Sequence, residues 1–389
     1  MPAFSDVEEP FEGVRRIAVL RGGGIGDLLF ALPAIDALAA TYPDAEITLL
    51  GSPVHAALLE GRPSPVSRVE LLPIERGVRE AAGEQPDPVK TAEFRARVRR
   101  RGPLDLGVQV HGGGRYSNPF LIGLGPRHSV GSATTDAVEL ERTLPYVYYQ
   151  HEVVRGLEVV ALAGAEPVTL EPRLSVTPSE RSAVARHLPA DGRPLAVVHP
   201  GATDLRRRWP GERFARVIDG LLEAGASVRL IGDAGERPLA AAIARDVAAG
   251  HARDDSRLEV LAGSLSLGES AALLEAADVV VANDSGPRHL AQAVGAATVG
   301  VFWFGNVVNA APFSRGRQRV HLSFTVACPV CGIDVTQVGW TAERCEHDVS
   351  FVTDVDVGAV LDDALQLMAT SPPRSGTRGA LGSRSRRAG

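Results

Sequence analysis

The segment of residues 278–295, DVVVANDSGPRHLAQAVG, constrains the fold of this chain more than any other stretch. Its opening residues are mainly apolar and β-branched, which is typical of a buried parallel strand. The letters NDSGP follow at once, and a capping residue, a glycine and a proline are start signals of a helix. The chain therefore runs from a strand end directly into a helix N-terminus, where backbone N–H groups and the helix dipole favour an anion. Taken alone, the segment also fits an ordinary capped helix of an α/β domain.

Length and composition narrow the class of protein. The chain has 389 residues, of which 44% are hydrophobic, which is enough for two domains with full cores. A formal net charge of −6 gives no general attraction to nucleic acid. We find no uninterrupted apolar stretch of about 18 residues and no apolar core near the acidic N-terminus, so we expect neither a membrane span nor a signal peptide. Three cysteines argue against a disulfide scaffold, and a reducing cytoplasm is the expected location.

Apolar strands alternate with helical patterns in both halves, which predicts stacked βαβ units. In the first half we expect strands at 16–20, 46–50, 69–72 and 106–110, helices at 28–40 and 151–164, and a surface helix or loop within 76–102. In the second half we expect strands at 195–199, 227–231, 258–261, 278–282 and 298–302, and helices at 211–224, 235–249, 267–276 and 287–294.

This pattern predicts an α/β fold with two Rossmann-like, doubly wound parallel-sheet domains that face a cleft. We place the first domain at 14–175 and the second at 194–350, with 165–193 containing the linker. A C-terminal helix is expected at 351–370, followed by a disordered, arginine-rich tail at 371–389. That tail offers contact with anionic phospholipid at the inner face of the plasma membrane, although an idle solvated tail is the simpler interpretation. Ligands of such sheets bind beyond the carboxyl ends of the strands.

A glycine loop, RGGGIGD at 21–27, follows the first strand. It does not have the dinucleotide-binding spacing G-x-G-x-x-G, because Asp27 occupies the sixth position, and no Gly-Lys-Ser/Thr follows to make a Walker motif. Gly23, Gly24 and Gly26 indicate close approach of a ligand. Asp27 at the helix start is either a plain N-cap or a general base for a hydroxyl in the cleft.

Two further loops follow strands of the second half. The letters HPGATDLRRRWP begin at residue 199, and their arginines suit a diphosphate, which Arg can bind in a bidentate way. A solvated charge run beside a packed tryptophan is the alternative. The letters GDAGE at 232–236 present Glu236 as a ligand for a ribose diol, although they also fit a common helix N-terminus.

Together these segments resemble glycosyltransferase family 9, the ADP-heptose:lipopolysaccharide heptosyltransferases, over about residues 15–365. The matching pieces are, in order, RIAVLRGGGIGDLLFALPAIDALAATYPDAEITLL, VVHPGATDLRRRWPGERFARV and DVVVANDSGPRHLAQAVGAATVGVF. The resemblance implies the GT-B fold, with the nucleotide sugar held mainly by the second domain. It also implies inversion at the anomeric centre with no metal ion and no other cofactor.

The resemblance implies a role for several residues. Asp27 matches the acid proposed as general base for the acceptor hydroxyl. Arg207 stands where the family usually has Lys and would neutralise the diphosphate leaving group, although the change alters the geometry of the cation. Glu236 matches the acid that holds the nucleotide ribose. His111, in HGGGRY after a strand of the first half, lies where acceptor selection would occur, and it is the next candidate for the base.

The segment 278–295 supplies the rest of the predicted donor site. Asp284 matches the acid near the donor sugar, where it is able to take a sugar or ribose hydroxyl. The N–H groups of Ser285 and Gly286 would bind phosphate. His289 belongs to the same string, and a packed, hydrogen-bonded histidine is the interpretation that we favour for it.

The cysteines form a separate cluster near the C-terminus. Cys328, Cys331, Cys345 and His347 have the residue types and the spacing of a zinc site. Packed or reversibly oxidised thiols are the expected arrangement and zinc the alternative, because cysteines are common at this position of the family and no metal is generally assigned to them. Any metal here would be structural.

We therefore predict an inverting, metal-independent glycosyltransferase of lipopolysaccharide core biosynthesis. It would move a sugar, first of all a heptose, from a nucleotide diphosphate sugar such as ADP-heptose to a glycan or lipid-linked acceptor. Two alternatives stay open: another GT-B enzyme such as a sugar-nucleotide epimerase, and a non-catalytic nucleotide-sugar-binding protein. Asp27 argues against the second alternative, because a binding protein has no need of a base.

Overall fold

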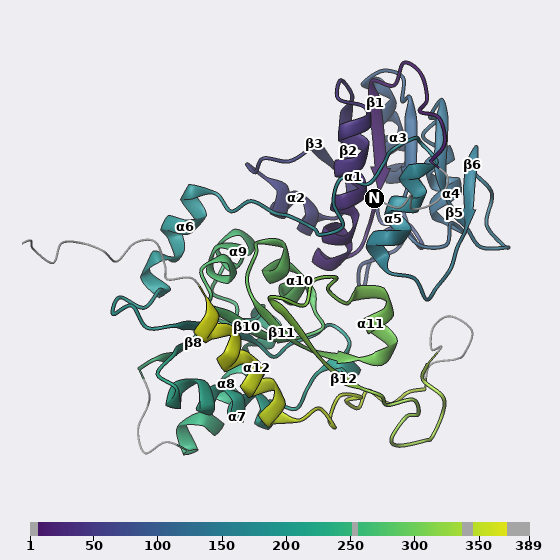
Figure 1. Ribbon diagram of the computed structural model, residues 1–389. Helices are drawn as coiled ribbons and strands as arrows, with labels where there is room; N and C mark the ends of the chain where they lie inside the picture. The colour runs from purple at the N-terminus through teal and green to yellow at the C-terminus, as the bar shows by residue number, and fades with distance from the viewer. Residues whose placement is uncertain (1–6, 251–255, 337–344, 372–389) are drawn as a thin grey trace, which may run out of the picture.

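The computed structural model describes residues 7–250, 256–336 and 345–371, and it shows two α/β bodies, each built around one parallel sheet (Figure 1). The predicted disordered tail therefore lies outside the described residues, apart from Ser371, whose hydroxyl donates to the Asp278 carbonyl at 2.8 Å. Within the described part of the chain, no helix combines the length and the apolar character needed to cross a membrane.

The first body contains a six-stranded sheet in the order β3-β2-β1-β4-β5-β6, in which all neighbouring strands are parallel. Its strands are β1 (Arg16–Leu20), β2 (Glu46–Gly51), β3 (Val66–Leu71), β4 (Leu106–Gln109), β5 (His128–Ala133) and β6 (Arg142–Pro145). Its helices are α1 (Ile25–Thr41), α2 (Pro53–Leu59), α3 (Pro88–Arg100), α4 (Ser117–Ile122) and α5 (Glu152–Ala161).

The second body repeats this topology, with the sheet order β12-β11-β10-β7-β8-β9. Its strands are β7 (Leu195–His199), β8 (Ser227–Leu230), β9 (Leu258–Val260), β10 (Val279–Asn283), β11 (Thr298–Trp303) and β12 (Gln318–Ser323). Its helices are α7 (Gly211–Glu223), α8 (Arg237–Gly250), α9 (Leu267–Glu275), α10 (Gly286–Ala293), α11 (Phe304–Ala310) and α12 (Val357–Thr370). Short 3₁₀ turns η1 (Ala185–His187), η2 (Leu205–Arg207) and η3 (Ala234–Glu236) join some of these elements.

In both sheets the strand order reverses beside the first strand, between β1 and β4 and between β7 and β10. A ligand crevice forms at such a switch point, because the loops from the two neighbouring strands leave in opposite directions. The glycine loop and His111 follow β1 and β4, while His199 and Asp284 lie at the ends of β7 and β10. The predicted α/β class with two doubly wound sheets is thus confirmed, and the topology brings the predicted site residues to the two switch points.

Several elements differ from the sequence-based expectation. Strands β5, β6 and β12 were not predicted, because their sequences HSVGSA, RTLP and QRVHLS mix small, polar and charged residues. Helix α1 begins at Ile25, three residues before the predicted start, so that Gly26 lies inside its first turn. The predicted linker is not a plain connector, since it contains α6 (Pro178–Val184), which packs against α9.

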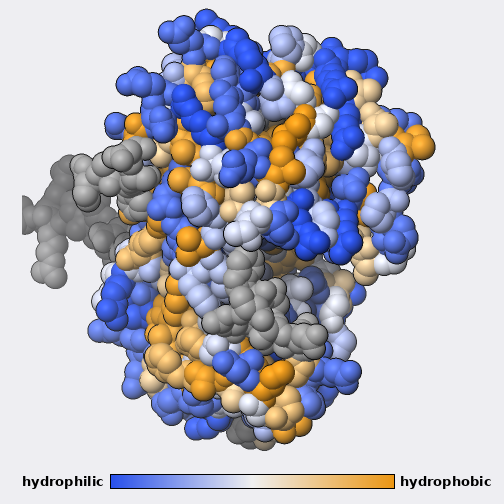
Figure 2. Space-filling view, turned by 90° about the vertical axis from the view of Figure 1, so that its right-hand side faces the viewer, coloured by the Kyte–Doolittle hydropathy of each residue, from blue (hydrophilic) through white to orange (hydrophobic). Residues whose placement is uncertain are grey.

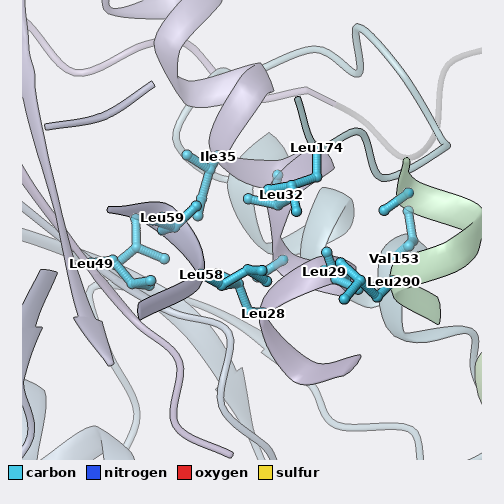
Figure 3. Packing of buried hydrophobic residues seen from close by; sticks show 14 of the residues in the cluster. Leu28, Leu29, Leu32, Ile35, Leu49, Leu58, Leu59, Val153, Leu174 and Leu290 are labelled. Carbon is cyan, nitrogen blue, oxygen red and sulfur yellow. The ribbon is translucent and has the colours of Figure 1, made fainter. Parts of the chain in front are cut away.

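Helix α1 joins the cores of the two bodies. Its residues are apolar on nearly every side, and Leu28, Leu29 and Leu32 are buried. Leu29 lies beside Leu290 of α10 and Val153 of α5 in one continuous cluster (Figure 3). Burying a leucine side chain contributes about 1.5–3 kcal/mol, so this contact holds the start of α1 against the start of α10.

Candidate active site

A cavity of about 900 Å³ lies between the two bodies, at the carboxyl ends of both sheets. The first body lines it with the start of α1 and with Glu152, and the second with the loops after β7, β8 and β10. In the space-filling view, a hollow separates the upper from the lower body on the face that carries β6 and α11 (Figure 2). Every predicted donor residue, Arg207, Glu236, Asp284, Ser285, Gly286 and His289, lines this cavity.

The glycine loop shapes the first-body wall around Asp27. Gly23 has a φ of +91°, and a Cβ there would lie 2.3 Å from Oδ2 of Asp27, so a side chain would be strained and would clash. Oδ2 accepts the N–H of Gly24 at 2.8 Å, and Oδ1 accepts Nη2 of Arg21 at 2.6 Å. Asp27 is the third residue of the helix, and the N-cap position is held by Gly24. Its carboxylate still caps the helix by receiving the Gly24 N–H.

The charges around Asp27 keep it ionised. Burial opposes ionisation, but the Arg21 guanidinium and the Gly24 N–H together hold the pKa of this carboxyl below its ordinary value. Arg21 is itself fixed, because it also donates to Oε2 of Glu152 at 3.1 Å and to the carbonyl of Val110 at 2.6 Å. The Asp27 side chain remains 46% exposed, so the carboxylate faces the cleft.

A second cavity, of about 810 Å³, opens on the other side of Asp27. His111 and the residues after it line it, together with Arg21, Asp27 and Glu152. Asp27 and Glu152 therefore line both cavities. His111 accepts the N–H of Gly22 on Nδ1 at 3.1 Å, and burial together with the nearby Arg21 lowers its pKa to about 4, so it is neutral at pH 7.

Asp284 lies at the centre of the second-body wall and is buried, with 1% of its side chain exposed. Its Oδ1 accepts Nε2 of His289 at 3.1 Å, and its Oδ2 accepts Nη1 of Arg207 at 3.3 Å and Nδ2 of Asn306 at 2.7 Å. Burial opposes ionisation, but these hydrogen bonds and positive charges hold the pKa of Asp284 well below its usual range. The carboxylate thus anchors three side chains at once.

The position of the proton on His289 follows from its neighbours. Nη2 of Arg288 lies 2.6 Å from Nδ1 of His289, and a guanidinium only donates. Nδ1 therefore accepts, and Nε2 carries the proton that is donated to Asp284. Burial and the neighbouring Arg288 lower the pKa of His289 to about 4. The geometry agrees with a packed, hydrogen-bonded and neutral histidine, whose ring meets Phe30 of α1 edge-on at 4.7 Å.

Glu236 and Ser285 are joined through His199. Nε2 of His199 donates to Oε2 of Glu236 at 3.2 Å, and Nδ1 lies 3.1 Å from the hydroxyl of Ser285. The Glu236 carboxylate also approaches Gly201 so closely that a Cβ there would lie 1.6 Å from Oε1. Burial opposes ionisation of Glu236, but His199 and the Asp233 N–H outweigh it and lower its pKa.

The start of α10 and Arg207 form the cationic part of the wall. Ser285 is the N-cap and Gly286 opens the helix, whose first-turn N–H groups have no partner inside the helix. Arg207 lies across from them, with 27% of its side chain exposed. The side chain of Asn283 fixes this geometry, because it accepts the N–H of Trp209 at 3.0 Å and donates to the Pro200 carbonyl at 2.7 Å.

Four residues of this site were not predicted from the sequence. Arg21 and His199 are the first letters of the two quoted loop motifs, at the ends of β1 and β7, but no role was predicted for their side chains. Glu152 and Asn306 reach the cavity through the packing of α5 and α11, and no local pattern indicates that. The cysteine cluster lies in the segment after β12, and none of its residues lines the cavity.

Two Rossmann-like sheets of identical order that face a shared cleft form the GT-B architecture. The model of glycosyltransferase family 9 (heptosyltransferase) matches residues 117–328, which is more than half of the chain. The chain belongs to this family, and the resemblance inferred from its motifs is confirmed. It is therefore a glycosyltransferase enzyme.

Three known proteins show how far the similarity extends. The chain is 25% identical to lipopolysaccharide heptosyltransferase 1 of Pseudomonas aeruginosa over 324 residues, which is 81% of this chain and 86% of that protein. The structure of ADP-heptose lps heptosyltransferase II of E. coli superimposes with a TM-score of 0.68 at 20% identity, over 92% of this chain and 99% of that one. The structure of the E. coli heptosyltransferase WaaC with ADP gives a TM-score of 0.60 at 22% identity, over 79% of this chain and 93% of that one. These two structures confirm the fold.

Proposed function

We propose that this enzyme transfers a heptose from ADP-heptose to a sugar of a lipopolysaccharide core or another lipid-linked glycan. The transfer inverts the anomeric centre and needs no metal ion. One observation carries the proposal: the ionised carboxylate of Asp27 lies on the wall shared by two large cavities. A donor in one cavity and an acceptor in the other would meet at this carboxylate. The names of the relatives support the choice of heptose and ADP.

In the cavity between the two bodies, the second-body wall suits the nucleotide. The diphosphate would lie between Arg207 and the first-turn N–H groups of α10, since both favour negative charge. Glu236 would accept hydrogen bonds from the hydroxyls of the ribose. Ile231, Leu265 and Leu267 line the same cavity and offer an apolar surface to the adenine ring. Because 1% of the Asp284 side chain is exposed and both of its oxygens already accept protein donors, we assign it the positioning of Arg207 and Asn306 in place of a direct contact with the sugar.

The chemistry is a single displacement. The acceptor hydroxyl enters from the second cavity, and Asp27 removes its proton as the oxygen attacks the anomeric carbon. The bond to ADP breaks on the opposite face, which inverts the configuration. Arg207 and the helix start stabilise the charge that develops on the departing diphosphate, with their donors already in place. Arg21, which also donates to Glu152, keeps the Asp27 carboxylate ionised and oriented.

Arg207 and the helix dipole supply the charge stabilisation that a metal ion supplies in other transferases. Asp354 and Asp356 have the Asp-x-Asp spacing of metal-dependent glycosyltransferases, but they precede α12 and do not line the cavity. We therefore expect transfer to survive chelation by EDTA. Loss of turnover that Mg²⁺ or Mn²⁺ restores would contradict this part of the proposal. The peripheral membrane contact expected from the sequence stays a prediction.

The donor half is tested by titrating ADP into the full chain by calorimetry. Arg207→Ala should weaken ADP binding by about 10–100-fold, because a hydrogen bond to a charged group is worth roughly 1.5–3 kcal/mol. Arg193→Ala is the matched control, since Arg193 pairs with Asp191 on the surface and does not line the cavity. Equal affinity in both variants would remove Arg207 from the site.

A further inference from the structure

The segment after β12 contains a tight turn that presents two thiols. Its letters CPVCG place Cys328 and Cys331 three positions apart, and the N–H of Gly332 donates to the Cys328 carbonyl at 2.9 Å. Gly332 has a φ of +73°, which a glycine adopts without strain. An antiparallel bridge between Ala327 and Asp334 closes the base of the turn. This is a short hairpin whose tip carries both sulfur atoms.

The turn also prepares one thiol for metal binding. The backbone N–H groups of Cys331 and Val330 are directed at the sulfur of Cys328. The thiolate is the form of cysteine that binds metals. N–H groups directed at a sulfur atom stabilise that form both free and in a metal complex.

Two further ligand-type side chains reach the same point from the far end of the loop. The sulfurs of Cys328, Cys331 and Cys345 and a ring nitrogen of His347 all lie within 4.8 Å of one another. Tetrahedral zinc with Zn–S bonds of about 2.3 Å places its sulfur ligands roughly 3.8 Å apart, so a small inward movement completes the shell. Nδ1 of His347 is buried and has no hydrogen-bond partner among the described residues. A buried nitrogen without a protein partner requires another partner, and a bound ion supplies one.

We propose that Cys328, Cys331, Cys345 and His347 bind one structural Zn²⁺ ion. Three thiolates and one imidazole in a closed tetrahedral arrangement suit this ion, whereas Mg²⁺ and Ca²⁺ require oxygen ligands. The geometry thus favours zinc over the packed or oxidised thiols that the sequence led us to expect.

The ion would hold the loop against two supports of the active site. Beneath the cluster, Cys328 packs with Phe351 and Trp303. The N–H of Phe351 donates to the carbonyl of Arg206 at 2.7 Å, directly beside Arg207. Trp303 immediately precedes α11, and its Nε1 donates to the carbonyl of Thr325 at 2.7 Å, in the segment that follows β12. Zinc would therefore stabilise the Arg207 loop and α11 without entering the chemistry.

Elemental analysis of the full chain, purified without chelators, tests the site. We expect about one zinc per chain in the wild type, and less than about one tenth of that in Cys331→Ser and His347→Gln, because each removes one of four ligands. His128→Gln is the matched control, since His128 pairs with Glu141 on the first body and should leave the zinc content unchanged. Zinc that persists in the two ligand variants would overturn the proposal. A disulfide without metal, or iron in place of zinc, would also overturn it.

A second measurement on the wild type guards against variants that fail to fold. After the zinc is removed with a strong chelator, Co²⁺ should restore the thermal stability and give the visible bands of a tetrahedral thiolate site. Mg²⁺ should restore nothing. Failure of Co²⁺ to give those bands, or unchanged stability on zinc removal, would contradict a structural metal. Because sugar transfer from ADP-heptose in brief EDTA is measured separately, this proposal can fail while the proposed function holds.

Discussion

Asp284→Asn is the substitution that tests the organisation of the donor wall most strictly. The carboxylate accepts hydrogen bonds from His289, Arg207 and Asn306 while 1% of its side chain is exposed. The amide keeps one acceptor oxygen and places an NH₂ group where the other oxygen stood. Either orientation sets that group against a donor: His289 on one side, Arg207 and Asn306 on the other. His289 cannot adapt by moving its proton, because its Nδ1 must accept from Arg288.

The expected cost follows from this geometry. Breaking a buried, hydrogen-bonded charge pair typically costs about 3–5 kcal/mol, because the remaining charge is left without its partner. For a domain of about 150–250 residues, each kcal/mol lowers Tm by roughly 2–4 °C. We therefore expect Tm to fall by about 10 °C. ADP affinity should also fall, because Arg207 loses the anchor that directs it into the cavity.

Differential scanning calorimetry at pH 7 measures this effect directly. Asp44→Asn is the matched control, because Asp44 is 75% exposed and pairs with Arg15 on the surface. An exposed pair of that kind contributes about 0–1 kcal/mol, so its loss should leave Tm within a few degrees of the wild type. If Asp284→Asn behaves like this control, the carboxylate does not anchor the donor wall.

Two further predictions concern the same wall. Gly201→Ala should weaken ADP binding with little loss of folding stability, because the added methyl group would lie 1.6 Å from Oε1 of Glu236 and must push that carboxylate away. Calorimetry measures the ADP affinity, and an unchanged affinity would count against the placement of Glu236. Acid should destabilise the protein between about pH 6.5 and pH 4, because His289 binds its proton in the unfolded chain at the ordinary pKa of 6.5 but in the folded chain only at about 4. That difference in pKa is worth up to roughly 3 kcal/mol of unfolding free energy. Urea unfolding at pH 7 and pH 5 should show that His289→Gln loses less stability in acid than the wild type does. Equal losses of stability would contradict this prediction.

The sequence predicted the parts of the fold that bury apolar faces. Strands β1 and β7 were located to the residue, because RIAVL and LAVVH are apolar and end at clear turn signals. Strands β5, β6 and β12 escaped because they lie toward the edges of their sheets, where fewer apolar side chains are needed. Pairing with a neighbouring strand, which no local window contains, decides their structure.

The site residues likewise divide into those that the sequence predicted and those that depend on tertiary packing. Asp27, Glu236 and Asp284 each follow a strand, so a parallel topology is enough to bring them to one cleft. Glu152 and Asn306 arrive on helices that follow other strands, and their contacts with Arg21 and Asp284 depend on how α5 and α11 pack. The burial of Asp284, which changes its proposed role, also depends on that packing.

Asp27 is the proposed base of the transfer, and the kcat of Asp27→Asn is the measurement that decides this role. The amide is nearly isosteric, and its oxygen can still accept the N–H of Gly24. Its NH₂ group then faces Arg21, but 46% of this side chain is exposed to solvent, so helix α1 and ADP-heptose affinity should change little. Without a proton acceptor, kcat should fall by about 10²–10⁴-fold, the usual contribution of a positioned acid–base group. A variant that transfers sugar at close to the wild-type rate, with donor binding intact, would show that Asp27 is not the base.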